Sequence, residues 1–163
     1  MKKVAIIMGS KSDAEVLRPA VNTLKKFGVE SVVRVLSAHR TPEDAAKFVS
    51  SLESNDFGAV ICAAGKAAHL AGVAAAHTVL PVIGLPMKSS FMDGLDSLLS
   101  TVQMPAGVPV ATVAVNGGEN AALLAVQILA VGDSELRAKI AEYKKNMAEK
   151  ILSDDEKIGE FFD

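Results

Sequence analysis

The feature of this chain that most constrains its fold is the regular alternation of short apolar runs with longer helical patterns. Five runs have the composition of β-strands, at residues 4–8, 31–36, 59–63, 79–85 and 108–115. Helical patterns follow them at residues 13–27, 42–52, 67–77, 93–103, 120–131 and 134–152. Two of the runs are apolar at every position, which indicates strands covered by helices on both faces of a parallel sheet. The sequence therefore predicts a doubly wound α/β domain with five strands and one extra helix at its C-terminus.

Single residues indicate where several of these helices begin and end. Gly28 is expected to end the first helix, because glycine readily adopts the left-handed conformation found after a helix. Thr41 is expected to cap the second helix, with Pro42 in its first turn. Asp133 or Ser134 is expected to cap the last helix.

The last helix carries an apolar stripe although the sheet is already complete before it begins. The stripe consists of Leu136, Ile140, Tyr143, Met147 and Ile151. It fits either a helix packed on its own domain or an arm that lies on a neighbouring subunit. The tail also carries Phe161 and Phe162 near its end, which an exposed tail would not need, and this favours the arm.

Length and composition restrict the class of protein. The 163 residues predict one domain at residues 1–163, with a core at about 3–131 and a C-terminal helical arm at about 133–163. The formal net charge of −2 gives no indication of nucleic-acid binding, and the one cysteine, Cys62, excludes an intrachain disulfide. No segment is long and apolar enough for a membrane span or a signal peptide. We therefore expect a cytoplasmic protein that does not bind membranes.

Three loops with polar and small residues follow the first three strands, at residues 9–13, 37–42 and 64–70. Ligands of open α/β sheets bind at the carboxyl ends of the strands, near the point where the strand order reverses. If the first strand lies between the second and the third, all three loops meet at one edge of the sheet. The alternation of elements thus predicts a single site built from these loops.

The first loop has the composition of an anion-binding turn. Gly9 permits a tight connection from strand to helix, Ser10 and Ser12 supply hydroxyl groups, and the helix start supplies free N–H groups. This composition equally fits ordinary helix capping by Ser12 or Asp13. The spacing of a Walker phosphate loop is absent.

The other two loops contain the histidines that could transfer a proton. His39 is the acid/base candidate, because imidazole titrates near neutral pH, and Arg40 beside it could bind a phosphate. The same pair could equally be an ordinary surface pair in a loop. His69 lies among small residues, where a satisfied core histidine is common, and Lys66 is either a solvated lysine or a contact to an anionic substrate. His77 is expected to be structural.

Several functional classes are disfavoured by missing motifs. The three histidines and the scattered acids lack the spacing of a metal site, so we expect no metal. The GxSxG turn of α/β-hydrolases and the GxGxxG turn of dinucleotide-binding folds are also absent.

Taken together, the motifs of this chain resemble those of the PurE family. The matching stretches occur in the family's order and spacing, at residues 8–13, 37–42, 67–70, 93–105, 107–112 and 120–124. The resemblance implies a three-layer α/β/α, flavodoxin-like fold. It also implies a homo-octamer whose last helix reaches a neighbouring subunit.

The resemblance further implies roles for individual residues. His39 would be the catalytic acid/base, Ser12 and Arg40 would bind the 5′-phosphate of a ribonucleotide, and Asp13 would bind its ribose. Ser10, Ala64, Gly65 and Ala68 would line the imidazole and CO2 pocket, and His69 would support catalysis. The remaining residues expected to bind the substrate are Ser37, Ala38, Lys66 and Leu70.

The PurE family contains two activities, and this chain resembles the mutase class. Mutases convert N5-carboxyaminoimidazole ribonucleotide to 4-carboxy-5-aminoimidazole ribonucleotide without a cofactor. Lys66 and Ala71 depart from the usual mutase pattern, which has glycine and proline at these positions. Direct carboxylation of aminoimidazole ribonucleotide by CO2 is the alternative within the family. Outside it, a non-catalytic nucleotide-binding module or a flavin-binding electron carrier remains open, although the few aromatic residues disfavour the carrier.

Overall fold

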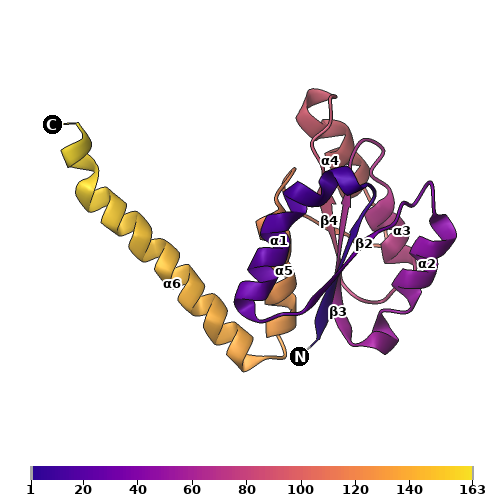
Figure 1. The fold of residues 1–163 in the computed structure, drawn as a ribbon, viewed down its shortest axis with the longest axis horizontal. Helices are drawn as coiled ribbons and strands as arrows, with labels where there is room; N and C mark the ends of the chain where they lie inside the picture. The colour runs from indigo at the N-terminus through magenta and orange to yellow at the C-terminus, as the bar shows by residue number, and fades with distance from the viewer. Residues whose placement is uncertain (1, 163) are drawn as a thin grey trace.

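The computed structural model describes residues 2–162, and its centre is a five-stranded parallel sheet with the order β2-β1-β3-β4-β5 (Figure 1). The strands are β1 (Lys3–Met8), β2 (Ser31–Val35), β3 (Phe57–Ala64), β4 (Val82–Pro86) and β5 (Ala111–Thr112). Because β1 lies between β2 and β3, the chain reverses its direction of progress across the sheet at β1. The predicted five-stranded parallel sheet is confirmed, and the loops after the three N-terminal strands start at the same edge.

Helices cover both faces of this sheet, as the sequence predicts. They are α1 (Ala14–Phe27), α2 (Pro42–Ser50), α3 (Leu70–Ala76), α4 (Leu95–Val102), α5 (Gly118–Ala130) and α6 (Ser134–Lys157). Helices α1 and α5 pack together on one face, and α2, α3 and α4 lie on the other (Figure 1). The result is a three-layer α/β/α, flavodoxin-like fold with an extra C-terminal helix.

The alternation of side chains along the strands produces two separate apolar clusters. Val4, Ile6 and Met8 of β1 face α1 and α5, whereas Ala5 and Ile7 face α2 and α3. All five are less than 5% exposed, because a parallel strand covered on both sides needs apolar residues at consecutive positions.

The C-terminal strands are shorter than the sequence predicts. The strand expected at residues 79–85 begins only at Val82, after Pro81, and Val79 is 85% exposed. The strand expected at residues 108–115 retains only Ala111–Thr112. Pro109 lacks the N–H group that a ladder needs, which limits how far β5 can extend toward its N-terminus.

Two helices also begin later than predicted, because backbone with positive φ precedes them. Lys66, directly before the segment expected to open α3, has φ +57°, and the helix starts only at Leu70. Asp93 and Gly94 have φ +55° and +106° before α4 starts at Leu95. Left-handed backbone cannot continue a right-handed helix, so these residues form turns instead.

Two of the predicted helix ends are confirmed, and one cap works differently. Gly28 ends α1 with φ +77°, and its N–H donates to the carbonyls of Leu24 and Lys25. Asp133 caps α6, because its carboxylate accepts hydrogen bonds from the first backbone N–H groups of that helix. Thr41 precedes α2 but makes no side-chain cap, since its hydroxyl bonds to the backbone of Ser37.

Helix α6 leaves the body of the domain along its length (Figure 1). Leu136 at its start is fully buried, and Ile140 and Tyr143 pack against the cluster formed with α1 and α5. The later stripe residues Met147 and Ile151 are exposed. After α6 comes a 3-10 turn (Ile158–Phe161), followed by Phe162. Phe161 and Phe162 are 80% and 79% exposed. None of the helices in residues 2–162 is both long and apolar enough to cross a membrane.

Candidate active site

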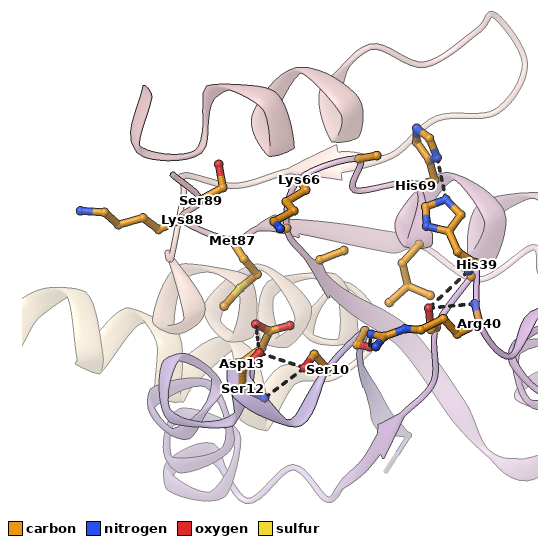
Figure 2. Close-up of a pocket in the computed structure, with 17 residues that line it drawn as sticks. Ser10, Ser12, Asp13, His39, Arg40, Lys66, His69, Met87, Lys88 and Ser89 are labelled. Carbon is orange, nitrogen blue, oxygen red and sulfur yellow. Dashed lines mark hydrogen bonds between the residues drawn. The ribbon is translucent and has the colours of Figure 1, made fainter. Parts of the chain in front are cut away.

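A cavity of about 580 Å³ lies at the carboxyl edge of the sheet (Figure 2). The turns after β1, β2, β3 and β4 all contribute to its wall. It is lined by Gly9, Ser10, Ser12, Asp13, Ser37, Ala38, His39, Arg40, Ala64, Gly65, Lys66, Ala67, His69, Leu70, Met87, Lys88 and Ser89. The convergence of the three predicted loops on one site is therefore observed.

The turn after β1 is organised by Ser10. Its side-chain oxygen accepts hydrogen bonds from the Ser12 backbone N–H at 3.3 Å and from the Ser12 hydroxyl at 2.9 Å. Ser10 therefore caps the short 3-10 helix Lys11–Asp13, whereas the sequence suggested Ser12 or Asp13 as capping residues. The Asp13 carboxylate accepts a bond from the Ser12 hydroxyl at 3.3 Å.

Asp13 is the one carboxylate among the residues that line the cavity, and its environment makes ionisation harder. Burial raises the pKa of Asp13 above its ordinary value, and hydrogen bonds from Ser12 and Ser10 offset part of that effect. A carboxylate that has lost part of its hydration gains from hydrogen bonds donated by a ligand. Asp13 can therefore accept donors such as the hydroxyl groups of a sugar.

The turn after β2 directs Arg40 toward the turn after β1. The Ser37 hydroxyl oxygen accepts hydrogen bonds from the backbone N–H groups of His39 and Arg40, at 3.3 Å and 3.1 Å. Arg40 Nη2 donates to the carbonyl of Gly9 at 2.8 Å. One edge of the guanidinium is thus anchored beside Ser10, which leaves its other donors for an anion.

The two histidines predicted from the second and third loops are in direct contact. His39 Nε2 and His69 Nδ1 are 2.9 Å apart, and the two rings are nearly perpendicular, with an interplanar angle of 87° (Figure 2). A hydrogen bond at this distance requires one nitrogen to carry a proton and the other to accept it. His69 is therefore a partner of His39, and not the isolated core histidine that was one interpretation of its surroundings. His77 is exposed at the end of α3 and does not line the cavity.

The turn after β3 supplies a wall of small residues with one lysine. Ala64 and Gly65 line the cavity where the sequence places them, and Lys66 projects from the same turn. Ala68 differs from expectation: it is 1% exposed and does not line the cavity. Its position in a motif could not reveal that its side chain turns into the protein.

Sequence reasoning missed the fourth turn, where Met87, Lys88 and Ser89 complete the wall. The buried Ser97 of α4 holds this turn, because its hydroxyl lies 2.6 Å from the carbonyl of Met87. The backbone N–H of Lys88 also donates to the side-chain oxygen of Asn116 at 2.9 Å. The signal available was position alone, since the turn follows a strand of the same parallel sheet.

The structure gives little support for a metal site or for a reactive cysteine. Within residues 2–162, no group of three or more His, Cys, Asp and Glu side chains could hold a metal ion. Burial raises the pKa of the Cys62 thiol to about 12, which keeps it protonated and unreactive at neutral pH. Among the described residues, neither a metal cluster nor a reactive thiol therefore offers an alternative to the cavity.

Comparison with known proteins decides the family. A model of the AIR carboxylase family matches residues 3–150. The chain belongs to this family. Other members of the AIR carboxylase family resemble it along almost its whole length. An N5-carboxyaminoimidazole ribonucleotide mutase of Saccharolobus solfataricus is 52% identical, over 94% of this chain and 97% of that protein. A protein of the same name from Methanocaldococcus jannaschii is 51% identical, over 98% of this chain and 99% of that protein.

The fold of this AIR carboxylase family member is also that of a solved relative. The crystal structure of Treponema denticola PurE superposes with a TM-score of 0.89 at 32% sequence identity. The match covers 96% of this chain and 98% of that one. The predicted resemblance to the PurE family is confirmed.

Proposed function

We propose that this chain isomerises N5-carboxyaminoimidazole ribonucleotide to 4-carboxy-5-aminoimidazole ribonucleotide in de novo purine biosynthesis. Relatives that carry the mutase name match it over nearly their entire length. The observation that supports the proposed chemistry is the contact between His39 and His69. Their ring nitrogens are 2.9 Å apart on the wall of the cavity at the carboxyl edge of the sheet. A proton-transfer group thus lies where a nucleotide can bind.

The nucleotide would be held at the end of the cavity formed by the turns after β1 and β2. The hydroxyl of Ser12 and the free edge of Arg40 are the donors that a 5′-phosphate needs, and a guanidinium suits such an anion by its geometry. The bond from Arg40 to the Gly9 carbonyl supports this role, because it fixes the guanidinium at the turn that carries Ser12 before a ligand arrives. Asp13 would accept hydrogen bonds from the ribose hydroxyls.

The aminoimidazole ring of the nucleotide would then lie against the small residues of the cavity wall, within reach of His39. The side chains of Ser10 and Ala64 and the backbone of Gly65 leave room for an imidazole ring and for a CO2 molecule. Ser37, Ala38 and Leu70 line the same cavity and would complete its contacts with the substrate.

The reaction proceeds in two steps that share one proton. The bond between the exocyclic nitrogen and its carboxylate breaks, CO2 forms, and His39 donates a proton to the nitrogen that becomes the free amine. The enamine carbon C4 then attacks the retained CO2 to form the new carbon–carbon bond. His39 removes the C4 proton, which restores the aromatic ring and returns His39 to its starting state. The atoms and charges balance without an oxidant, a reductant or a cofactor.

His69 acts through its contact with His39. The hydrogen bond between the rings fixes the orientation of the His39 imidazole. It also provides a neighbour that accepts or donates a proton as His39 changes state. Retention of CO2 beside this pair makes the second step effectively intramolecular. The reaction can therefore proceed with His39 and His69 as its proton-transfer groups.

The proposal includes a single-domain subunit that assembles into a homo-octamer through its C-terminal arm. Exposed apolar side chains on the distal half of α6 and on the tail support an arm that contacts another subunit. They are Met147, Ile151, Leu152, Ile158, Phe161 and Phe162. Edge strand β2 also exposes Val33 and Val35, at 41% and 53%. A cytoplasmic location is part of the same proposal, and the one unpaired cysteine fits a reducing compartment.

An assay with two substrates tests the proposed reaction. The protein is given N5-carboxyaminoimidazole ribonucleotide in one tube and aminoimidazole ribonucleotide with bicarbonate in another, without ATP. Rapid formation of the 4-carboxy product from the first substrate alone, corrected for spontaneous decay, is the expected result. Efficient product formation in the second tube, with the first no faster than decay allows, would make the protein a direct carboxylase. Binding without conversion in either tube would make it a nucleotide-binding module.

A further inference from the structure

The charges around the cavity raise a question that the proposed function leaves open. The proposed substrate carries two anionic groups, a phosphate and a carboxylate, at opposite ends of the nucleotide. Separate cationic groups are expected for separate anions. Three cationic side chains line the cavity: Arg40, Lys66 and Lys88. Their contacts distinguish which of them is available for the carboxylate.

Two of these three cationic side chains already have partners within the protein. Arg40 is bonded to the carbonyl of Gly9 and therefore stays at the phosphate end of the cavity. Lys88 forms an ion pair with Asp93, with 3.0 Å between Nζ and the carboxylate oxygen. Its charge is thus compensated within the protein.

Among the described residues, Lys66 has neither kind of compensating contact for its ammonium group. Its ammonium group forms no ion pair with any carboxylate in the part of the chain the structure describes, residues 2–162. Figure 2 shows its side chain directed into the cavity, between the His39–His69 pair and the turn of Lys88. Lys66 and His69 belong to the same turn, and both line the cavity that also contains His39.

The backbone of Lys66 gives a second, independent observation. Its φ of +57° lies in the left-handed region, which is unfavourable for a residue with a Cβ atom but not for glycine. Unfavourable backbone conformations of this kind are concentrated at sites where function requires them. The lysine side chain is thus placed in the cavity at a cost to the stability of the turn.

We propose that Lys66 binds the migrating carboxylate of the substrate and thereby distinguishes carboxylated from uncarboxylated aminoimidazole ribonucleotides. The inference rests on the proposed function and adds a specificity-determining residue to it. The carboxylate loses its negative charge when CO2 forms and regains it at C4, so the contact with Lys66 is strong in the substrate and the product and weakest while CO2 is free. Loss of that contact should therefore raise KM without a comparable fall in kcat.

Binding of two nucleotides to matched variants tests the proposal. The probes are 4-carboxy-5-aminoimidazole ribonucleotide and aminoimidazole ribonucleotide, which differ by the carboxylate alone. Lys66→Met removes the charge and keeps an unbranched side chain one atom shorter, Lys66→Arg keeps the charge, and Lys66→Gly removes the charge together with the backbone strain. Lys88→Met is the control, because it removes a cavity lysine whose charge is already paired. Titration calorimetry on the full-length protein gives each affinity, and steady-state assays give KM and kcat.

Lys66→Met and Lys66→Gly should weaken binding of the carboxylated nucleotide about tenfold, the range for loss of one charge-assisted hydrogen bond. They should leave affinity for aminoimidazole ribonucleotide unchanged, and Lys66→Arg should restore most of the discrimination. Lys88→Met should weaken neither nucleotide selectively. An equal loss for both nucleotides in the Lys66 variants, or no loss for either, overturns the role of Lys66. If the unsubstituted protein binds neither nucleotide, the proposed function itself fails, and the inference falls with it.

Discussion

Gly84 of β4 lets α4 pack closely against the sheet. Its replacement by alanine should push α4 outward and so displace the part of the cavity wall that α4 supports. A Cβ atom at this position would lie 2.3 Å from Cγ2 of Thr101 and 2.9 Å from Cγ1 of Val110. Carbon atoms in contact are ordinarily about 3.5–4.0 Å apart, so α4 or β4 must move. Overpacking of this kind costs roughly 1–3 kcal/mol. For a chain of this size, that lowers the melting temperature by roughly 2–12 °C.

Gly132→Ala is the matched control for Gly84→Ala. No atom lies within 4 Å of the Cβ that Gly132 would gain, and its φ is not in the left-handed region. Thermal unfolding of both variants at equal protein concentration should show the loss for Gly84→Ala alone. Because α4 carries Ser97, whose hydroxyl holds the carbonyl of Met87, nucleotide affinity should fall in the same variant. Equal melting temperatures for both variants and the unsubstituted protein would refute this account of how α4 packs.

Three further predictions concern single side chains of the cavity and the core. Arg40→Ala should weaken binding of aminoimidazole ribonucleotide about tenfold or more, measured by calorimetry, because a charge-assisted contact to the phosphate is lost; an unchanged affinity would contradict that role. Asp13→Asn should raise the melting temperature at neutral pH. Burial raises the pKa of Asp13, so its ionisation lowers the stability of the folded protein as pH rises through that pKa, and the gain should shrink as pH is lowered toward the ordinary carboxyl range. Cys62 should resist alkylation in the native protein and react only after unfolding, as followed by mass spectrometry; rapid native labelling would show that the thiol is accessible.

The convergence of the active-site turns was predictable from the sequence because it follows from topology. Once strands alternate with helices, the carboxyl ends of parallel strands share one edge, and the turns that carry Ser12, His39 and His69 must meet there. The contact between the two histidines was not predictable in the same way. Residues 30 positions apart come within 2.9 Å only through side-chain orientations that the tertiary packing determines.

The features that the sequence did not predict depend on local backbone geometry. The left-handed conformation of Lys66 lies in the turn before α3, and lysine as a residue type gives no signal for positive φ. The contribution of Met87 to the cavity wall was missed because its residue type suggests no polar chemistry, and its placement depends on the distant Ser97. The capping role of Ser10 was missed because a short 3-10 helix, Lys11–Asp13, precedes α1; Asp13 holds the N-cap position of α1 itself but makes no side-chain cap there.

The central claim is that His39 transfers the proton of the reaction and is not required to bind the nucleotide. Its most direct test compares turnover and binding in His39→Asn, with His77→Asn as the control, since His77 is exposed at the end of α3 and outside the cavity. Turnover of N5-carboxyaminoimidazole ribonucleotide by His39→Asn should fall by about a hundredfold or more, the contribution of a positioned acid/base group. Its affinity for aminoimidazole ribonucleotide should stay close to that of the unsubstituted protein, and His77→Asn should resemble that protein in both measurements. Retention of turnover by His39→Asn, or loss of nucleotide binding together with turnover, would contradict the claim.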